Sequence, residues 1–114
     1  MEKFYDLSPL HEICEGDERF IKEMVKVFAE NTKKVVAEME KQVDEGNRTQ
    51  LRKLAHSIKS NMHTYGVPQA YEILKEIEMQ ADQDDMPALK QKVMSLGKIT
   101  GKAIEQMETD FNIS

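Results

Sequence analysis

Apolar residues recur at three- and four-residue steps along most of the chain, which is the spacing of amphipathic helices that bury one side. Runs of β-branched residues are short, and Ala, Glu, Lys, Met, Gln and Leu dominate, which also favours helix. Four long or medium helices are predicted, over residues 18–44, 47–66, 68–81 and about 85–111. Because the turns between them are short, we expect an all-α fold, an antiparallel up-and-down four-helix bundle.

A short extra helix is predicted near the N-terminus. Ser8 can cap it, Pro9 suits its first position, and Leu10 and Ile13 form an apolar side that should lie over one end of the bundle. Gly16-Asp17 ends this element and caps the next helix.

The first long helix, residues 18–44, has a predicted apolar stripe of Ile21, Met24, Val27, Phe28, Val35, Met39 and Val43. Asn31 and Thr32 interrupt this stripe. We expect one continuous helix with polar residues at the edge of the stripe. A bend, or two helices in series, is the alternative.

Local chemistry predicts where the other helices begin and end. Asn47 follows Gly46 and can cap the second helix, whose end at Gly66 suits the left-handed position just past a helix. Pro68 begins the third helix, and one of the later aspartates of residues 82–85 caps the fourth.

The second of these helices carries an outward-facing histidine. Leu51, Leu54, Ala55, Ile58, Met62 and Tyr65 form its inner side. At roughly 100° per residue, His56 points about 160° away from Ile58 and therefore faces water. Arg52, Lys59, Ser60 and His63 share the outward half of the helix with it.

Positive charge surrounds this histidine. The chain has a formal net charge of -5, yet no Asp or Glu occurs from Gly46 to Tyr71. The same window contains four cationic side chains, Arg48, Arg52, Lys53 and Lys59. An acid-free basic belt favours an anion on the histidine, and phosphate is the obvious candidate. The alternative is a solvated helix face on which the histidine is incidental.

The residues around His56 resemble a known signature. Ala55-His56-Ser57-Ile58-Lys59-Ser60, with Gly66 ten residues after the histidine, is similar to the motif of histidine-containing phosphotransfer (HPt) domains. Three flanking segments, residues 10–21, 44–47 and 73–78, also resemble the family at the matching distances from this motif. The resemblance covers nearly the whole chain, from about Tyr5 to Phe111. We therefore expect one HPt-like domain over residues 1–114.

The resemblance implies roles for individual residues. His56 matches the phospho-accepting histidine, Lys59 the lysine that contacts the phosphoryl group, and Gly66 the glycine that ends the helix. Ser60 departs from the family, which most often has glycine there. Its hydroxyl could crowd an approaching partner or hydrogen-bond the phosphate. Glu78 matches a position whose side chain can lie near the imidazole and orient it.

Arg52, His63 and Glu78 are the residues we expect on the surface that docks a partner. The implied partners are response-regulator receiver domains and a hybrid sensor histidine kinase. By this resemblance, His56 takes a phosphoryl group from a receiver aspartate and passes it to another receiver in a two-component phosphorelay. The chain is then a phosphocarrier and not an enzyme in its own right, since its sequence has no phosphate-binding glycine-rich loop.

Two other functions stay open. A non-catalytic adaptor would bind receivers without carrying phosphate, and Ser60 in place of glycine is the feature that favours it. A plain helical bundle that assembles with other helices would not bind receivers at all.

Composition narrows the setting further. The chain has 114 residues, enough for one domain, and its negative charge argues against nucleic-acid binding. No window is apolar enough for a membrane span, and the N-terminus lacks an apolar signal segment. Cys14 is the single cysteine, which favours a reducing compartment. We expect a cytoplasmic monomer.

A metal site is not expected. His56 and His63 are seven residues apart, too far to chelate one ion comfortably, and His11 is remote in sequence. We expect no cofactor in the chain itself, and any Mg²⁺ that the reaction needs should come with the receiver.

Overall fold

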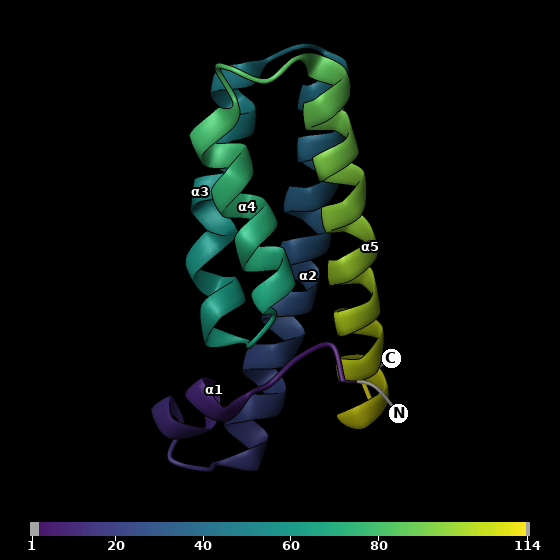
Figure 1. The fold of residues 1–114 in the computed structure, drawn as a ribbon. Coiled ribbons are helices and arrows are strands. Elements are labelled where there is room, and N and C mark those ends of the chain that lie inside the picture. Colours follow the sequence, from purple (N-terminus) through teal and green to yellow (C-terminus); the bar gives the residue numbers. More distant parts are fainter. Residues whose placement is uncertain (1–2, 114) are drawn as a thin grey trace.

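Each long helix runs antiparallel to the one before it, and short turns join them (Figure 1). The structure is a computed structural model that describes residues 3–113. Within these residues there are five helices: α1 (Ser8–Ile13), α2 (Glu18–Asp44), α3 (Arg48–Thr64), α4 (Pro68–Gln80) and α5 (Met86–Asp110). The pairs α2–α3, α3–α4, α4–α5 and α2–α5 pack together, so the helices close into a four-helix bundle, and α1 packs on α3. The predicted all-α architecture is confirmed.

Side-chain caps set the start of three helices, as the sequence predicts. The Asp17 carboxylate accepts hydrogen bonds from the backbone N–H groups of Arg19 and Phe20 at the start of α2. Asn47 caps α3 through the N–H of Gln50, and Asp85 caps α5 through the N–H of Ala88. Each cap satisfies backbone donors that have no partner within the helix.

The predicted cap of α1 is wrong. Ser8 is the first residue of this helix, and Leu7 is in the N-cap position without a side-chain hydrogen bond. The Asp6 carboxylate, a stronger acceptor than a hydroxyl, takes both the N–H of Ser8 at 3.0 Å and its Oγ–H at 2.6 Å. The serine hydroxyl therefore donates to Asp6 and does not cap the helix. Leu10 is fully buried, but Ile13 is 66% exposed, so only one of the two residues expected on the apolar side is covered.

Helix α2 is continuous from Glu18 to Asp44, as expected. Thr32 is completely buried within its inner stripe, so a polar residue at this position does not break the helix. Val27 was predicted to face inward but is 62% exposed. The predicted Ile21, Phe28, Met39 and Val43 are buried. The stripe also includes Val25, Ala29 and Val36, which at about 100° per residue lie roughly 160–180° around the helix from Val27.

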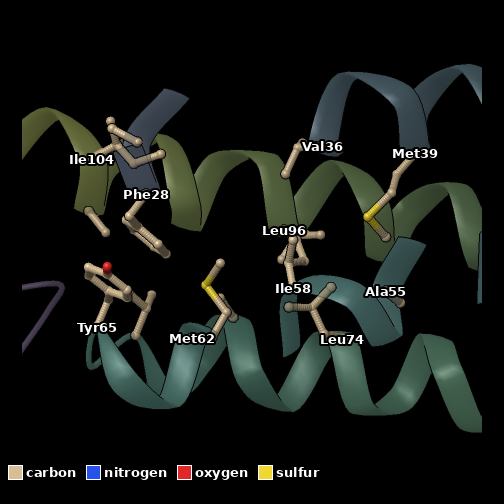
Figure 2. Close-up of a cluster of buried hydrophobic side chains, with 14 of the residues drawn as sticks. Phe28, Val36, Met39, Ala55, Ile58, Met62, Tyr65, Leu74, Leu96 and Ile104 are labelled. Carbon is tan, nitrogen blue, oxygen red and sulfur yellow. The ribbon is translucent and has the colours of Figure 1, made fainter. Parts of the chain in front are cut away.

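The inner side of α3 is buried in the hydrophobic core (Figure 2). Leu51, Ala55, Ile58 and Met62 are at most 1% exposed, and burial of a large apolar side chain contributes roughly 1.5–3 kcal/mol. At the end of α3 the Tyr65 ring stacks on Phe28 of α2, with centroids 4.1 Å apart. This packing fixes the rotation of α3 about its axis, and therefore fixes which side chains face outward.

The turn after α3 requires a glycine. Gly66 has φ +66, the left-handed conformation predicted for it, and its carbonyl accepts the N–H of Asp6 at 2.8 Å. A Cβ built on Gly66 would lie 1.6 Å from the Asp6 carbonyl oxygen. The N-terminal segment therefore crosses the α3–α4 turn at a point where no side chain fits.

None of the helices between residues 3 and 113 combines the length and the apolar character needed to cross a bilayer.

Candidate functional site

His56 lies in the middle of α3, between the buried residues Ala55 and Ile58. Its side chain is 71% exposed, which agrees with the outward orientation predicted from the helical spacing. The ring is thus carried by a rigid element whose other side is held in the core. Such placement gives an exposed group a defined position.

Glu78 of α4 links the histidine to a lysine. Its Oε1 lies 2.7 Å from Nδ1 of His56, and its Oε2 lies 2.7 Å from Nζ of Lys59. The Glu78 and Lys59 side chains are 23% and 26% exposed, so both heads are partly withdrawn from water. The three side chains form one connected polar cluster between α3 and α4.

The charges of this cluster follow from its geometry. The hydrogen bond from Lys59 is the largest influence on Glu78 and lowers its pKa. Partial burial disfavours the charged form and raises the pKa, while the hydrogen bond with His56 lowers it again. The same Lys59–Glu78 hydrogen bond raises the pKa of Lys59. At neutral pH Glu78 is therefore an ionised carboxylate and Lys59 a protonated ammonium.

These charges determine the tautomer of the histidine. An ionised carboxylate can only accept hydrogen bonds, so Nδ1 of His56 must be the donor in the contact with Glu78. When the ring is neutral, its one N–H is then on Nδ1, and the lone pair is on Nε2. The exposed ring can use Nε2 as a nucleophile toward a group that arrives from solvent.

The other predicted residues lie along the same helix. Ser60, in the turn after His56, is exposed. Arg52, one turn before His56, lies 3.4 Å from the Asp82 carboxylate. His63 is exposed two turns further along and has the Tyr71 ring 6.4 Å from its own. The structure therefore brings His56, Lys59 and Glu78 together, and leaves Arg52 and His63 on the surrounding surface.

The acid-free belt predicted around His56 exists in the sequence of α3 but not in space. Glu78 of α4 lies beside Lys59, and Asp82, in the turn after α4, lies beside Arg52. They are missed because Glu78 is 22 residues from His56 and Asp82 is 30 residues from Arg52, so only the packing of α4 on α3 reveals them. Lys59 is consequently a paired cation in this structure and not a free one.

Met79 is a surface residue that the sequence reading did not assign. It follows Glu78 in α4, and its side chain is 67% exposed. The inner stripe of α4 consists of Ala70, Leu74 and Ile77, with Ala81 after it, and Met79 falls outside that stripe. The periodicity of α4 was therefore a sufficient signal that this apolar side chain is exposed.

Within residues 3–113, no group of three or more His, Cys, Asp or Glu side chains is arranged to hold a metal ion.

Comparison with known proteins adds the family. The model of the Hpt domain matches residues 23–110, which include all three members of the His56 cluster. No curated protein and no solved structure matches the chain. Since the family match covers most of the chain, and the bundle and the exposed histidine agree with it, the chain belongs to the Hpt domain family, the phosphotransfer domains of two-component signalling systems.

Proposed function

We propose that His56 is the phosphoryl acceptor of this domain, and that it relays the group between receiver domains of a two-component phosphorelay. The observation that carries this proposal is the contact between Nδ1 of His56 and Glu78, because it leaves the Nε2 lone pair on an exposed ring. A histidine that only filled a solvated face would need no such partner.

The proposed reaction has two matched steps. In the first, Nε2 of His56 attacks the phosphorus of an aspartyl phosphate, an N–P bond forms, and the receiver aspartate leaves as a carboxylate. In the second, the carboxylate of another receiver attacks the same phosphorus and the N–P bond breaks. Nδ1 keeps its proton, held by Glu78, through both steps.

Lys59 is proposed to stabilise the phosphoryl oxygens. It lies one turn after His56, and its ammonium is held beside the ring by Glu78. As the phosphoryl group arrives with its negative charge, the ammonium can share its hydrogen bonds between Glu78 and a phosphoryl oxygen. Glu78 therefore has two roles here: it orients the imidazole and it keeps the lysine within reach.

The docking surface is proposed to surround His56 on α3 and α4. Arg52 and His63 provide polar contacts, and exposed Met79 provides an adaptable apolar one. The acidic pocket of a receiver suits Arg52 and Lys59, which lie one turn before and one turn after His56 on α3, and any Mg²⁺ the reaction needs is proposed to come with that pocket. A hybrid sensor histidine kinase is the proposed source of the phosphoryl group. Ser60 is exposed one turn after His56, so an incoming partner would contact the serine hydroxyl.

The test is phosphotransfer from a receiver that carries labelled phosphate on its aspartate. We expect acid-labile label on the wild-type chain and none on His56→Gln. His11→Gln is the control, since it removes a histidine of α1 that has no place in the proposed site or docking surface, and it should still be labelled. Equal labelling of the His56→Gln variant excludes His56 as the acceptor. Receiver binding without any label on His56 would favour the adaptor function.

A further inference from the structure

A groove of about 530 Å³ runs between α2 and α5. None of its lining residues comes from α3 or α4, the helices that hold the His56 cluster. Its floor is apolar, formed mainly by Val36, Val93 and Ile104. Met94 lines it from α5, and this large apolar side chain is 48% exposed.

Two glycines open this groove, and the chain's own packing does not require them. Gly97 and Gly101 lie in the interior of α5, where glycine is unfavourable relative to alanine. A Cβ on Gly101 would meet no atom within 4 Å, and one on Gly97 would make ordinary contacts at 3.5 Å and more. Exposed Ala37 lines the groove from α2. Gly101 thus leaves space that no part of residues 3–113 fills, whereas the Glu40 and Val36 side chains lie against Gly97.

Ion pairs across the groove create an alternating charge pattern. At one end Lys90 of α5 lies 3.2 Å from Asp44 of α2, and at the other end Lys33 of α2 lies 3.0 Å from Glu108 of α5. The α2 wall is therefore negative where the α5 wall is positive. The signs reverse at the far end, where Lys33 lines the groove and Glu108 lies just outside the residues that line it. Three of the four side chains are at least 57% exposed, so they remain available to further partners.

From this pattern we propose that the groove binds a second copy of this chain. A two-fold axis parallel to the helices places α2 of each copy on α5 of the other, at the same height along the bundle. Asp44 then faces Lys90 of the second copy, and Lys33 faces its Glu108, so the charged surface is complementary to itself.

The same axis explains the small residues. It places Ala37 of one copy over Gly97 and Gly101 of the other, so α2 and α5 can approach closely, and the two Met94 side chains enter the joint groove. Burial of this apolar surface provides the driving force, and the charges set the orientation. The proposed dimer differs from the monomer expected from the sequence, and it leaves His56 of both copies exposed on α3.

Sedimentation of the whole chain tests the proposal. Between about 1 and 200 µM we expect the mass to rise from the 13.2 kDa of one chain to twice that value. Gly101→Arg should stay at the mass of one chain throughout, because the new side chain fills the groove. It should fold normally, since nothing lies within 4 Å of its Cβ. The control Gln91→Arg adds the same group at an exposed position of α5 outside the groove and should dimerise as wild type. A wild-type chain that stays at 13.2 kDa, or a Gly101→Arg variant that still dimerises, overturns the proposal.

A charge swap tests the orientation of the two copies. The double variant Asp44→Lys, Lys90→Glu keeps the ion pair within each chain. It also keeps the facing charges complementary in a dimer of two variant chains. In a mixed dimer with wild type, like charges face each other at this end of the groove. Mixed dimers should therefore fall below the statistical share of about half. Mixing at the statistical share would overturn the proposed pairing of α2 with α5.

Discussion

Nδ1 of His56 lies 2.7 Å from Oε1 of Glu78, a contact between two helices that spans 22 residues of sequence. The carboxylate is ionised because Lys59 lies 2.7 Å from its other oxygen. One residue of α4 therefore fixes both the tautomer of the ring and the position of the nearest cation. The reactivity proposed for His56 depends on how α4 packs on α3.

Glu78→Gln should weaken the tautomer preference of His56. A glutamine amide can either accept from Nδ1 or donate to it, so the N–H is no longer restricted to that atom. We expect a population with the proton on Nε2 to appear in the ¹⁵N spectrum of the imidazole, and transfer from a phosphorylated receiver to slow by about tenfold. Glu76→Gln makes the same change of charge at an exposed position of α4 and should alter neither measurement. An unchanged tautomer in Glu78→Gln would contradict the role of this contact.

Lys59→Ala should slow phosphotransfer without unfolding the bundle. The ammonium is one turn from His56 and shares Glu78 with it, so its loss removes charge stabilisation of the phosphoryl oxygens. We expect a rate lower by about tenfold or more, with an unchanged helical circular dichroism spectrum. Lys53→Ala, an exposed lysine of the same helix, is the control. A full transfer rate in Lys59→Ala would remove the lysine from the mechanism.

The fold could be predicted from the sequence because its signals are local. Asp17, Asn47 and Asp85 cap helices through N–H groups two or three residues away, and the period of the apolar residues places the core side of α3 correctly. Two local predictions were wrong. Ser8 does not cap α1 because the neighbouring Asp6 carboxylate accepts its hydrogen bonds, and Val27 lies outside the buried stripe of α2.

The site was less predictable because its contacts are between helices. The exposure of His56 follows from the period of α3 alone. The pairing of Lys59 with Glu78, and of Arg52 with Asp82, depends on the register in which α4 packs against α3. Charge counted along the sequence therefore suggested a belt of free cations, whereas the folded surface has two of them paired with carboxylates.

The contribution of Glu78 to stability should depend on pH. Lys59 and His56 hold its pKa below the ordinary 4.5, so Glu78 stabilises the fold fully above that value and loses the contribution as pH falls through its folded pKa. The difference in unfolding free energy between wild type and Glu78→Gln should be constant near neutral pH and shrink below about pH 4.5. Urea denaturation of both proteins at several pH values measures this difference. A gap that widens in acid would have the wrong sign for a carboxylate with a lowered pKa.

Thr32→Val should stabilise the protein by up to about 1 kcal/mol. The Thr32 side chain is completely buried, and its hydroxyl has no hydrogen-bond partner among residues 3–113. Valine has nearly the same shape and removes the cost of an unpaired polar group. Thr100→Val is the matched control, because that buried hydroxyl donates to the Leu96 carbonyl at 2.8 Å and its removal should bring no gain. Equal effects of the two substitutions in thermal unfolding would contradict this explanation.

Gly66→Ala should cost more stability than Gly46→Ala, although both glycines end a helix with positive φ, +66 and +73. At Gly46 a Cβ meets nothing within 4 Å, so alanine loses only about 1–2 kcal/mol, the cost of placing a residue with a Cβ in the left-handed conformation. At Gly66 the same atom would lie 1.6 Å from the Asp6 carbonyl oxygen, and the hydrogen bond from the Asp6 N–H to the Gly66 carbonyl must also be displaced. We therefore expect Gly66→Ala to lose at least about 1 kcal/mol more than Gly46→Ala in urea denaturation. Similar losses in the two variants would show that the segment at Asp6 moves aside freely, and that the close approach does not hold the N-terminal segment against the α3–α4 turn.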